Sequence, residues 1–325
     1  MTKNVQNTPN TPNARKGDRS LAIVAYQGVQ EAAVLGLTDL FDTANTLSRE
    51  QGGIVINVEA IRPDRIPAVS VHYDALIVPP NRSNARGEAD SEFHAWIKAR
   101  HRAGTLTASV CAGVFWLGHA GLLARRPVTT HWALEDEVRA AFPDADLQPE
   151  HLLIDDSDII TAGGMMAWLD LGMFFVERWQ GVEVLSNTAR YLLIDPGKRE
   201  QRNYRSFRPN LNHGDETVLA LQLWMEGHVQ DDLGVEALAE RSKLSGRTFL
   251  RRFKAATGLN PNAYVQALRV EKARGLLERT REPVGAVGWA VGYQDFSAFG
   301  RVFRSVTGLT AAEYRRRFSV LDVRA

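Results

Sequence analysis

The chain has 325 residues and a formal net charge of +1, from 39 lysines and arginines against 38 aspartates and glutamates. This length is enough for two or three domains, each with its own hydrophobic core. The single cysteine excludes an internal disulfide and suits a reducing cytoplasm, and no run of eighteen apolar residues exists to cross a membrane.

The first 18 residues are rich in Asn, Thr and Pro and contain no apolar run, so we predict a disordered tail there rather than a signal peptide. From Arg19 onward, short apolar segments alternate with amphipathic ones. This pattern is typical of a parallel sheet covered by helices on both faces. The sequence therefore predicts a flavodoxin-like doubly wound α/β domain over residues 19–195. Strands are expected at 21–26, 54–61, 75–78, 105–110 and 128–130, helices around 37–44, 93–102, 113–120, 133–141 and 166–179, and a hairpin-like pair from 151.

The carboxyl edge of this predicted sheet is the candidate ligand pocket, because ligands of such sheets bind where the strands end. A cysteine, a histidine and a glutamate would meet there. The residues that follow the expected strands are Gln27, Gly28, Glu31, Pro79, Pro80, Asn81, Cys111, Ala112, His131 and Trp132.

The run SVCAG, from Ser109, has the form of a nucleophile elbow between a strand and a helix. A cysteine at a helix N-terminus is favoured as a thiolate, and His131 is a candidate base for it. Residues 19 to about 182 also resemble the ThiJ/PfpI superfamily, relatives of the class I glutamine amidotransferases. The matching pieces are Cys111 at the elbow, AGLL from Ala120, TTHW from Thr129 and DIITAGG from Asp158.

Two departures from the superfamily argue against catalysis. Hydrolytic members carry Gly-Gly after the third strand to donate oxyanion-hole N-H groups, whereas this chain has Pro79 and Pro80. Proline has no N-H, and the loss of one such donor costs about 2.7 to 4 kcal/mol of transition-state stabilisation. In addition, one register places Ala33, not Glu31, where catalytic relatives have the glutamate that contacts the cysteine. We expect no enzyme activity, no cofactor and no metal; the rival hypothesis is a cysteine hydrolase or glyoxalase-like enzyme.

The same pocket is suited to recognise a small molecule. Trp132, with Glu31 and Tyr26 nearby, can attract a cation by its ring face and by charge. Regulators that resemble this chain are associated with amino acids and with quaternary amines such as betaine and carnitine. The alternative is that Trp132 is a core or dimer-contact aromatic. The predicted ligand-binding residues are Tyr26, Glu31, Asn81, Cys111, His131 and Trp132.

The C-terminal third contains a duplication. FLRRFKAATGLNPNAY, from Phe249, returns fifty residues later as FGRVFRSVTGLTAAEY, from Phe299, which indicates two similar structural units. The charge balance also shifts there: residues 1–209 carry 22 basic and 25 acidic side chains, and residues 210–325 carry 17 and 13. A basic module is what a reader of a polyanion needs.

Each copy predicts a capped amphipathic helix preceded by a short helix and a tight turn. In the first copy Ser245 is the cap, Gly258 the stop, and Phe249, Phe253 and Ala256 the buried stripe. In the second copy Asp295 is the cap and Phe299, Phe303 and Val306 point inward. A helix, a turn and a second helix with a cationic outer face form the helix-turn-helix pattern, whose second helix enters the DNA major groove.

Residues from about 213 to 318 resemble the AraC/XylS-type DNA-binding domain, in which a long helix joins two helix-turn-helix units. The resemblance rests on SGRTFLRRF from Ser245, VGYQDFSAFGRVF from Val291, and Tyr264, Arg269 and Tyr314, among other positions. Asn260 and Pro261 are expected to open the joining helix, whose residues Tyr264 and Leu268 fall opposite Val270, Ala273 and Leu277. Gly285 and Gly288 depart from a good helix sequence and predict a looser second unit. The final helix has Ala311 where the joining helix has Pro261.

A ThiJ/PfpI-like domain followed by an AraC-type domain is the architecture of GlxA-like transcription regulators. The resemblance implies a sensor domain over residues 19–195, a polar linker over 196–212 and a DNA-binding domain over 213–325. We therefore expect a ligand-responsive regulator of the cytoplasm, an activator, with double-stranded DNA, a small-molecule effector and RNA polymerase as partners, acting as a homodimer. Base reading or phosphate contact is expected of Arg247, Leu250, Arg251, Lys254, Ser297, Arg301 and Arg304.

Overall fold

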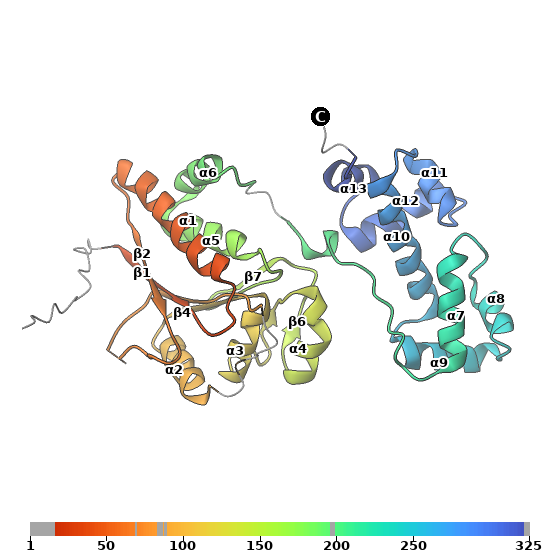
Figure 1. The fold of residues 1–325 in the computed structure, drawn as a ribbon, viewed down its shortest axis with the longest axis horizontal. Helices are drawn as coiled ribbons and strands as arrows, with labels where there is room; N and C mark the ends of the chain where they lie inside the picture. Colours follow the sequence, from red (N-terminus) through yellow and green to blue (C-terminus); the bar gives the residue numbers. More distant parts are fainter. Residues whose placement is uncertain (1–16, 69, 83–86, 88–89, 196–198, 322–325) are drawn as a thin grey trace, which may run out of the picture. The chain divides into compact units, whose positions relative to one another are not determined.

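The computed structural model describes residues 17–68, 70–82, 87, 90–195 and 199–321. The chain divides into two compact units, Met1–Gln201 and Arg202–Ala325, here called the N-terminal and the C-terminal unit (Figure 1). Most of the predicted tail, residues 1–16, lies outside the described residues.

The N-terminal unit is built on one mostly parallel sheet. Its strands, within the described residues, are β1 (Arg19–Val24), β2 (Ile56–Ile61), β3 (Ala75–Val78), β4 (Leu106–Val110), β7 (Leu153–Asp156) and β8 (Ile159–Ala162). They lie in the order β2-β1-β3-β4-β8-β7, and β7 pairs antiparallel with β8 while the other pairs are parallel. The five parallel strands follow the flavodoxin order, which confirms the predicted fold class, with one antiparallel strand added at the edge.

Helices cover both faces of this sheet. On one side lie α1 (Glu31–Glu50), α5 (Trp168–Gln180) and α6 (Val182–Tyr191), and on the other lie α2 (Ser91–Arg102) and α3 (Val114–His119) (Figure 1). The side chains of β3 are fully buried because neither face of a central strand meets water. Gly36 allows α1 and α5 to approach closely, since a Cβ atom there would lie 2.4 Å from the ring of Trp168.

The strand predicted at 128–130 is shorter than expected and does not belong to the main sheet. β5 (Pro127–Val128) pairs with β6 (Asp146–Leu147) in a separate two-stranded sheet. Thr129 leaves the strand because its N-H donates to Thr161 Oγ1 at 2.8 Å, and Thr130 Oγ1 donates to the carbonyl oxygen of Cys111 at 2.9 Å. The chain then enters a 3-10 turn at Trp132–Leu134 ahead of α4 (Glu135–Ala141).

The C-terminal unit is helical. Its helices are α7 (Glu216–Gly227), α8 (Val235–Arg241), α9 (Gly246–Thr257), α10 (Pro261–Arg279), α11 (Val284–Ala290), α12 (Phe296–Thr307) and α13 (Ala311–Phe318). As predicted, α10 serves both halves: Tyr264 and Leu268 join the core with α7 to α9, while Val270, Ala273 and Leu277 join the core with α11 to α13.

The predicted helix ends are confirmed. The side chains of Ser245, Asn260 and Asp295 each accept backbone N-H groups of the helices they precede. Gly258 ends α9 at a φ of 76° and Gly308 ends α12 at 78°, both in the left-handed region that glycine tolerates. A capping box formed by Thr310 and Glu313 opens α13, which compensates for the proline that Ala311 replaces.

Two details of the second copy differ from expectation. Val306 was predicted to point inward but is 39% exposed, because the buried stripe follows the i, i+4, i+8 positions and ends on Thr307. Gly288 has a packing reason: a Cβ atom there would lie 3.2 Å from the ring of Phe299, whereas one at Gly285 would meet nothing within 4 Å.

The predicted linker makes specific contacts. In the N-terminal unit Gln201 is only 2% exposed, and its Nε2 donates to the carbonyl oxygens of Thr130 at 2.7 Å and His151 at 2.9 Å. In the C-terminal unit Asn203 Nδ2 donates to the carbonyl oxygen of Thr307 at 2.7 Å. Arg274 donates to the carbonyl oxygens of Arg202 and Arg205. Part of the predicted linker is thus bound to folded elements, although Arg202, Tyr204 and Arg205 are exposed.

The pair Asp215 and Arg252 predicts an acid-sensitive contribution to stability. Asp215 caps α7 and accepts two hydrogen bonds from Arg252, at 2.7 and 2.9 Å, which lower its pKa from 3.8 to about 2. A lowered pKa means that the stabilisation is complete above pH 3.8 and is lost as the pH falls toward about 2. Asp215→Asn keeps a good cap but cannot form the ion pair. We expect its thermal unfolding midpoint, followed by circular dichroism, to fall below that of the wild type above pH 4, with the gap closing toward pH 2. A gap independent of pH would contradict this assignment.

Candidate nucleic-acid interface and ligand site

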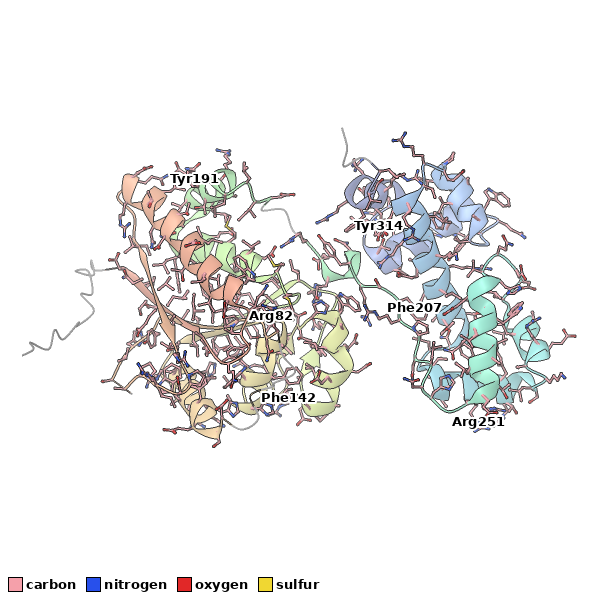
Figure 2. The ribbon with its side chains drawn as sticks, in the orientation of Figure 1. Arg82, Phe142, Tyr191, Phe207, Arg251 and Tyr314 are labelled. Atoms are coloured by element: carbon pink, nitrogen blue, oxygen red, sulfur yellow. The ribbon has the colours of Figure 1, made fainter. Side chains whose placement is uncertain are left out.

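The outer face of α9 carries the first set of predicted DNA-binding residues. Phe249 and Phe253 are fully buried against α8 and α10, which fixes the rotation of the helix. Arg247, Leu250, Arg251 and Lys254 therefore project outward and are all exposed. Arg251 lies at the periphery of the C-terminal unit in Figure 2. The face combines three cations with Leu250, which is 43% exposed.

The outer face of α12 repeats the arrangement. Phe299 and Phe303 are fully buried, and Ser297, Arg301 and Arg304 are exposed. Arg301 lies 4.0 Å from the capping carboxylate of Asp295, with both side chains more than half exposed. An exposed pair at that distance is weak, so the guanidinium is held only loosely.

Arg252 is less exposed than these residues, although it lies between the predicted DNA-binding residues Arg251 and Lys254 in the sequence. Its guanidinium binds Asp215 in the two-point geometry described above. The arginine is therefore assigned to the fold of the C-terminal unit, whereas its neighbour Arg251 is assigned to the outer face.

Arg269 of α10 ties the two halves of the C-terminal unit together. Its side chain donates to the carbonyl oxygens of Val229 and Asp231, both at 2.9 Å, in the loop after α7. Its guanidinium also lies 5.5 Å from the ring centre of Tyr293, in the turn between α11 and α12. Burial lowers the pKa of Arg269, which still leaves it charged at neutral pH. Gly292 permits the approach, because a Cβ atom there would lie 2.6 Å from the carbonyl oxygen of Val229.

The N-terminal unit has a hollow at the carboxyl edge of its sheet. Two adjoining depressions, of about 810 and 800 Å³, share residues 25–28 and Arg62 in their walls. These walls follow β1 and β2, and Arg82, shortly after β3, borders one of them. Because strand order reverses between β1 and β3, this is the topological switch point, where ligands of doubly wound sheets bind.

The hollow offers both charges and aromatic rings. Glu31 and Arg82 border one depression, and Tyr26 and Trp116, whose ring centres are 5.1 Å apart, border the other. Arg62 binds Asp64 through two hydrogen bonds of 2.9 and 3.1 Å, which lower the pKa of that carboxyl. A zwitterion or an organic cation fits such a lining.

The other predicted ligand residues are placed less directly. Asn81 is buried and forms a bridge with Val29, so it joins the ends of β1 and β3. His131 Nδ1 accepts the N-H of Ala133 at 3.0 Å, and its ring packs on that of Trp132. The N-H of Trp132 donates to Gln201. The structure thus brings Tyr26 and Glu31 to the hollow, while His131 and Trp132 lie beside the segment that ends the N-terminal unit.

The elbow at Cys111 has a strained backbone. Cys111 has a φ of 54°, a strained value for a residue with a side chain, and is 4% exposed. Gly113 lies so close to β3 that a Cβ atom would be 2.3 Å from the carbonyl oxygen of Val78. Pro79 and Pro80 present carbonyl oxygens, which accept from Tyr26 Oη and from the N-H of Gln30. Ala33 is fully buried and Glu31 is exposed.

Sequence reasoning missed several residues of the hollow, among them Arg62, Asp64, Trp116 and Arg82. The first two follow β2, and applying the strand-end rule to that strand would have found them. Trp116 gave no such signal, because it is one of several apolar residues on the helix after the elbow.

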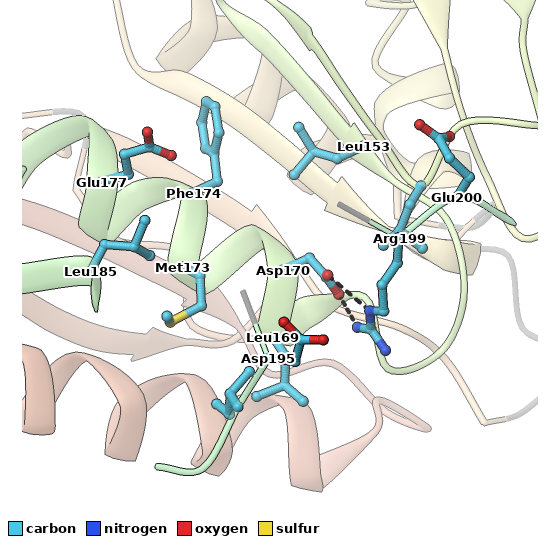
Figure 3. Close-up of a pocket in the computed structure, with 12 residues that line it drawn as sticks. Leu153, Leu169, Asp170, Met173, Phe174, Glu177, Leu185, Asp195, Arg199 and Glu200 are labelled. Atoms are coloured by element: carbon cyan, nitrogen blue, oxygen red, sulfur yellow. Dashed lines mark hydrogen bonds and ion pairs between the residues drawn. The ribbon is translucent and has the colours of Figure 1, made fainter. Parts of the chain in front are cut away.

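A further cavity of about 360 Å³ lies between α5, α6 and the segment before Gln201 (Figure 3). Its walls include Met173, Phe174 and Leu185, together with the ion pair of Asp170 and Arg199. The described residues hold no group of three or more His, Cys, Asp or Glu side chains placed to bind a metal ion. Within the same residues, no helix is long and apolar enough to span a membrane.

Comparison with known proteins identifies both units. The DJ-1/PfpI family profile matches residues 42–178, and a helix-turn-helix domain profile matches residues 238–317. The chain is 28% identical over 224 residues to the HTH-type transcriptional regulator ArgR of Pseudomonas aeruginosa, which covers 68% of this chain and 67% of ArgR. It is 26% identical over 231 residues to the regulator GlxA of Rhizobium meliloti, covering 70% of each. The crystal structure of the AdpA DNA-binding domain in complex with a target DNA matches 34% of this chain and all of that domain, at 30% identity and a TM-score of 0.33.

The order of the two matched domains agrees with the predicted architecture, and the relatives named are transcriptional regulators. The chain belongs to the AraC family of DNA-binding transcriptional regulators, in the GlxA- and ArgR-like group that carries a DJ-1/PfpI domain before the helix-turn-helix domain.

Proposed function

We propose that this regulator is a ligand-responsive activator of the cytoplasm, which acts as a homodimer and contacts RNA polymerase. The effector is a small amino acid or quaternary amine bound by the N-terminal unit. The observation that carries the proposal is the pairing of two outward cationic helices with a charged, aromatic-lined hollow at the switch point of the sheet.

In the C-terminal unit, α9 and α12 enter successive major grooves about 34 Å apart. Arg247, Leu250 and Arg251 read bases from α9, and Ser297 and Arg301 read from α12. Arginine pairs with guanine edges, and a leucine can meet a thymine methyl group. Lys254 and Arg304 contact phosphates, which positions the unit without reading sequence. The exposure of all seven side chains supports this assignment.

In the N-terminal unit, Tyr26 and Glu31 bind the effector in the hollow. Glu31 attracts an ammonium group, Arg82 attracts a carboxylate, and the rings of Tyr26 and Trp116 face the apolar or cationic part. The lining of both depressions supports this arrangement. The remaining ligand-binding residues of the proposal lie at the end of β3, at the elbow and beside Gln201. They are Asn81, Cys111, His131 and Trp132.

Sensing is favoured over catalysis at the elbow. The strained φ of Cys111 is the one feature that favours the rival enzyme. Against it stand the burial of the thiol, the two prolines where relatives donate N-H groups, and the fully buried Ala33.

Substitution of the recognition arginines tests the DNA interface. Arg251→Ala and Arg301→Ala are each expected to cost about 1 to 3 kcal/mol of binding to a selected duplex and to relax one base position, because a bidentate contact to a base is lost. Binding is measured by fluorescence anisotropy against duplexes that vary at each position. Arg281→Ala, which removes an exposed arginine outside both recognition helices, is the control and should leave base preference unchanged. Unchanged preference in both reader variants would place the interface elsewhere.

Substitution of Glu31 tests the effector site. In a thermal-shift screen of amino acids and quaternary amines, a binding ligand raises the melting temperature of the wild type. Glu31→Gln keeps the shape of the side chain but loses its charge, so the shift should shrink. Asp39→Asn, an exposed change on the same helix, should leave the shift intact. Equal shifts in all three proteins would exclude Glu31 from the site.

Thiol reactivity separates sensing from catalysis. With Cys111 only 4% exposed, its reaction with Ellman's reagent should be slow in the native protein and fast after unfolding in guanidinium chloride. The chain has one cysteine, so the absorbance change reports on this thiol alone. Fast reaction in the native state, with a thiol pKa well below about 8.5, would instead support the enzyme hypothesis.

A further inference from the structure

An exposed aromatic side chain opens the second recognition helix. Phe296 is the first residue of α12, and 58% of its surface is exposed. Single exposed apolar residues are common on protein surfaces, so this exposure decides nothing alone. Its position is more informative, because the N-terminal residues of a recognition helix are those that reach base edges.

One turn further along α12 lies a glycine that packing within the protein does not require. Gly300 lies in the middle of the helix, where glycine is unfavourable. A Cβ atom there would meet nothing within 4 Å, in contrast to Gly288, where it would press on Phe299. A glycine that packing does not require suits a close approach of the backbone to another molecule.

Phe296 and Gly300 lie on the same strip of the helix, because residues four apart are neighbours on a helix surface. The matching positions in α9 are Gly246 and Leu250. A Cβ atom at Gly246 would also meet nothing within 4 Å, and Leu250 is 43% exposed. Each recognition helix thus carries on this strip one exposed apolar side chain and one glycine that internal packing does not require. In α9 the glycine comes first along the chain, and in α12 the apolar residue comes first.

We propose that Phe296 is a specificity-determining residue that contacts the C5-methyl group of a thymine, and that Gly300 lets the backbone of α12 come close enough for this contact. The inference rests on the proposed reading of DNA by the outer face of α12. The thymine methyl is the apolar group on the major-groove edges of the base pairs, and phenylalanine is one of the side chains that meet it. Arg301 and Arg304, exposed beside the strip, supply the attraction to guanine and phosphate.

The reversed order gives the two helices different reading positions. In α9 the apolar reader Leu250 sits four residues into the helix, whereas in α12 Phe296 sits at its start. Four residues of helix span about 6 Å. The thymine read by α12 should therefore lie about two base pairs away from the position that Leu250 reads in its own half-site, since base pairs are about 3.4 Å apart.

Deoxyuridine, which lacks the methyl group and keeps every hydrogen-bonding group of thymine, is the probe. A duplex that binds the full-length wild type is selected from a random pool, and each thymine is replaced by deoxyuridine in turn. One thymine of the α12 half-site should lose about fourfold in affinity on replacement, the effect of one buried carbon. Phe296→Ala should bind the thymine duplex more weakly and bind both duplexes equally. Leu250→Ala is the matched control and should lose sensitivity only in the α9 half-site.

Gly300→Ala supplies an independent readout. It should raise the melting temperature, because alanine is the better helix former, and weaken DNA binding, because the backbone can no longer approach. The proposal is overturned if the wild type tolerates deoxyuridine throughout the α12 half-site, or if Phe296→Ala keeps the full preference for thymine. These results would leave the proposed DNA reading by the arginines intact. A wild type that selects no duplex would overturn both.

Discussion

The C-terminal unit depends on the half-buried guanidinium of Arg269. It sits at the middle of α10, where the two small hydrophobic cores meet end to end, and binds backbone carbonyls on one side and an aromatic ring on the other. Each core is small, so directional contacts between the two halves add to what apolar packing provides. The directional hydrogen bonds of Arg269 supply such contacts, and Gly292 provides the space they need. The spacing of α9 and α12 follows from this junction.

The N-terminal unit places its hollow at one edge of the sheet. The central strands β3 and β8 are fully buried and β1 and β4 nearly so, which leaves the loops at the carboxyl edge to carry accessible polar groups at that end of the sheet. The loops after β1 and β3 are tied by the Val29 and Asn81 bridge and by the hydrogen bond from the N-H of Gln30 to the carbonyl oxygen of Pro80. These contacts join the two loops beside Tyr26 and Glu31, which border the hollow.

Local patterns were enough to predict much of this architecture. The caps at Ser245, Asn260 and Asp295, the division of α10 between two cores and the flavodoxin-like sheet follow from spacing and residue type, because those features are set by near neighbours. The errors arise where distant residues decide. Thr129 and Thr130 read as the end of a strand, but hydrogen bonds to Thr161 and Cys111 pull them out of the sheet. No pattern near them in sequence signals those partners.

The predicted linker shows the same limit. A polar, proline-flanked run that contains Asn and Gln predicts a solvated linker. Gln201 is nevertheless buried, and its side chain donates hydrogen bonds to the carbonyl oxygens of Thr130 and His151. Thr130 in turn binds the carbonyl oxygen of Cys111 at the elbow. Gly163 makes room for this arrangement, since a Cβ atom there would lie 1.8 Å from the amide of Gln201. Gln201 is the last residue of the N-terminal unit, so the chain leaves this unit at a residue whose side chain is held by Thr130 and His151. Two hydrogen bonds in series thus connect the backbone of the elbow to the last residue of the N-terminal unit.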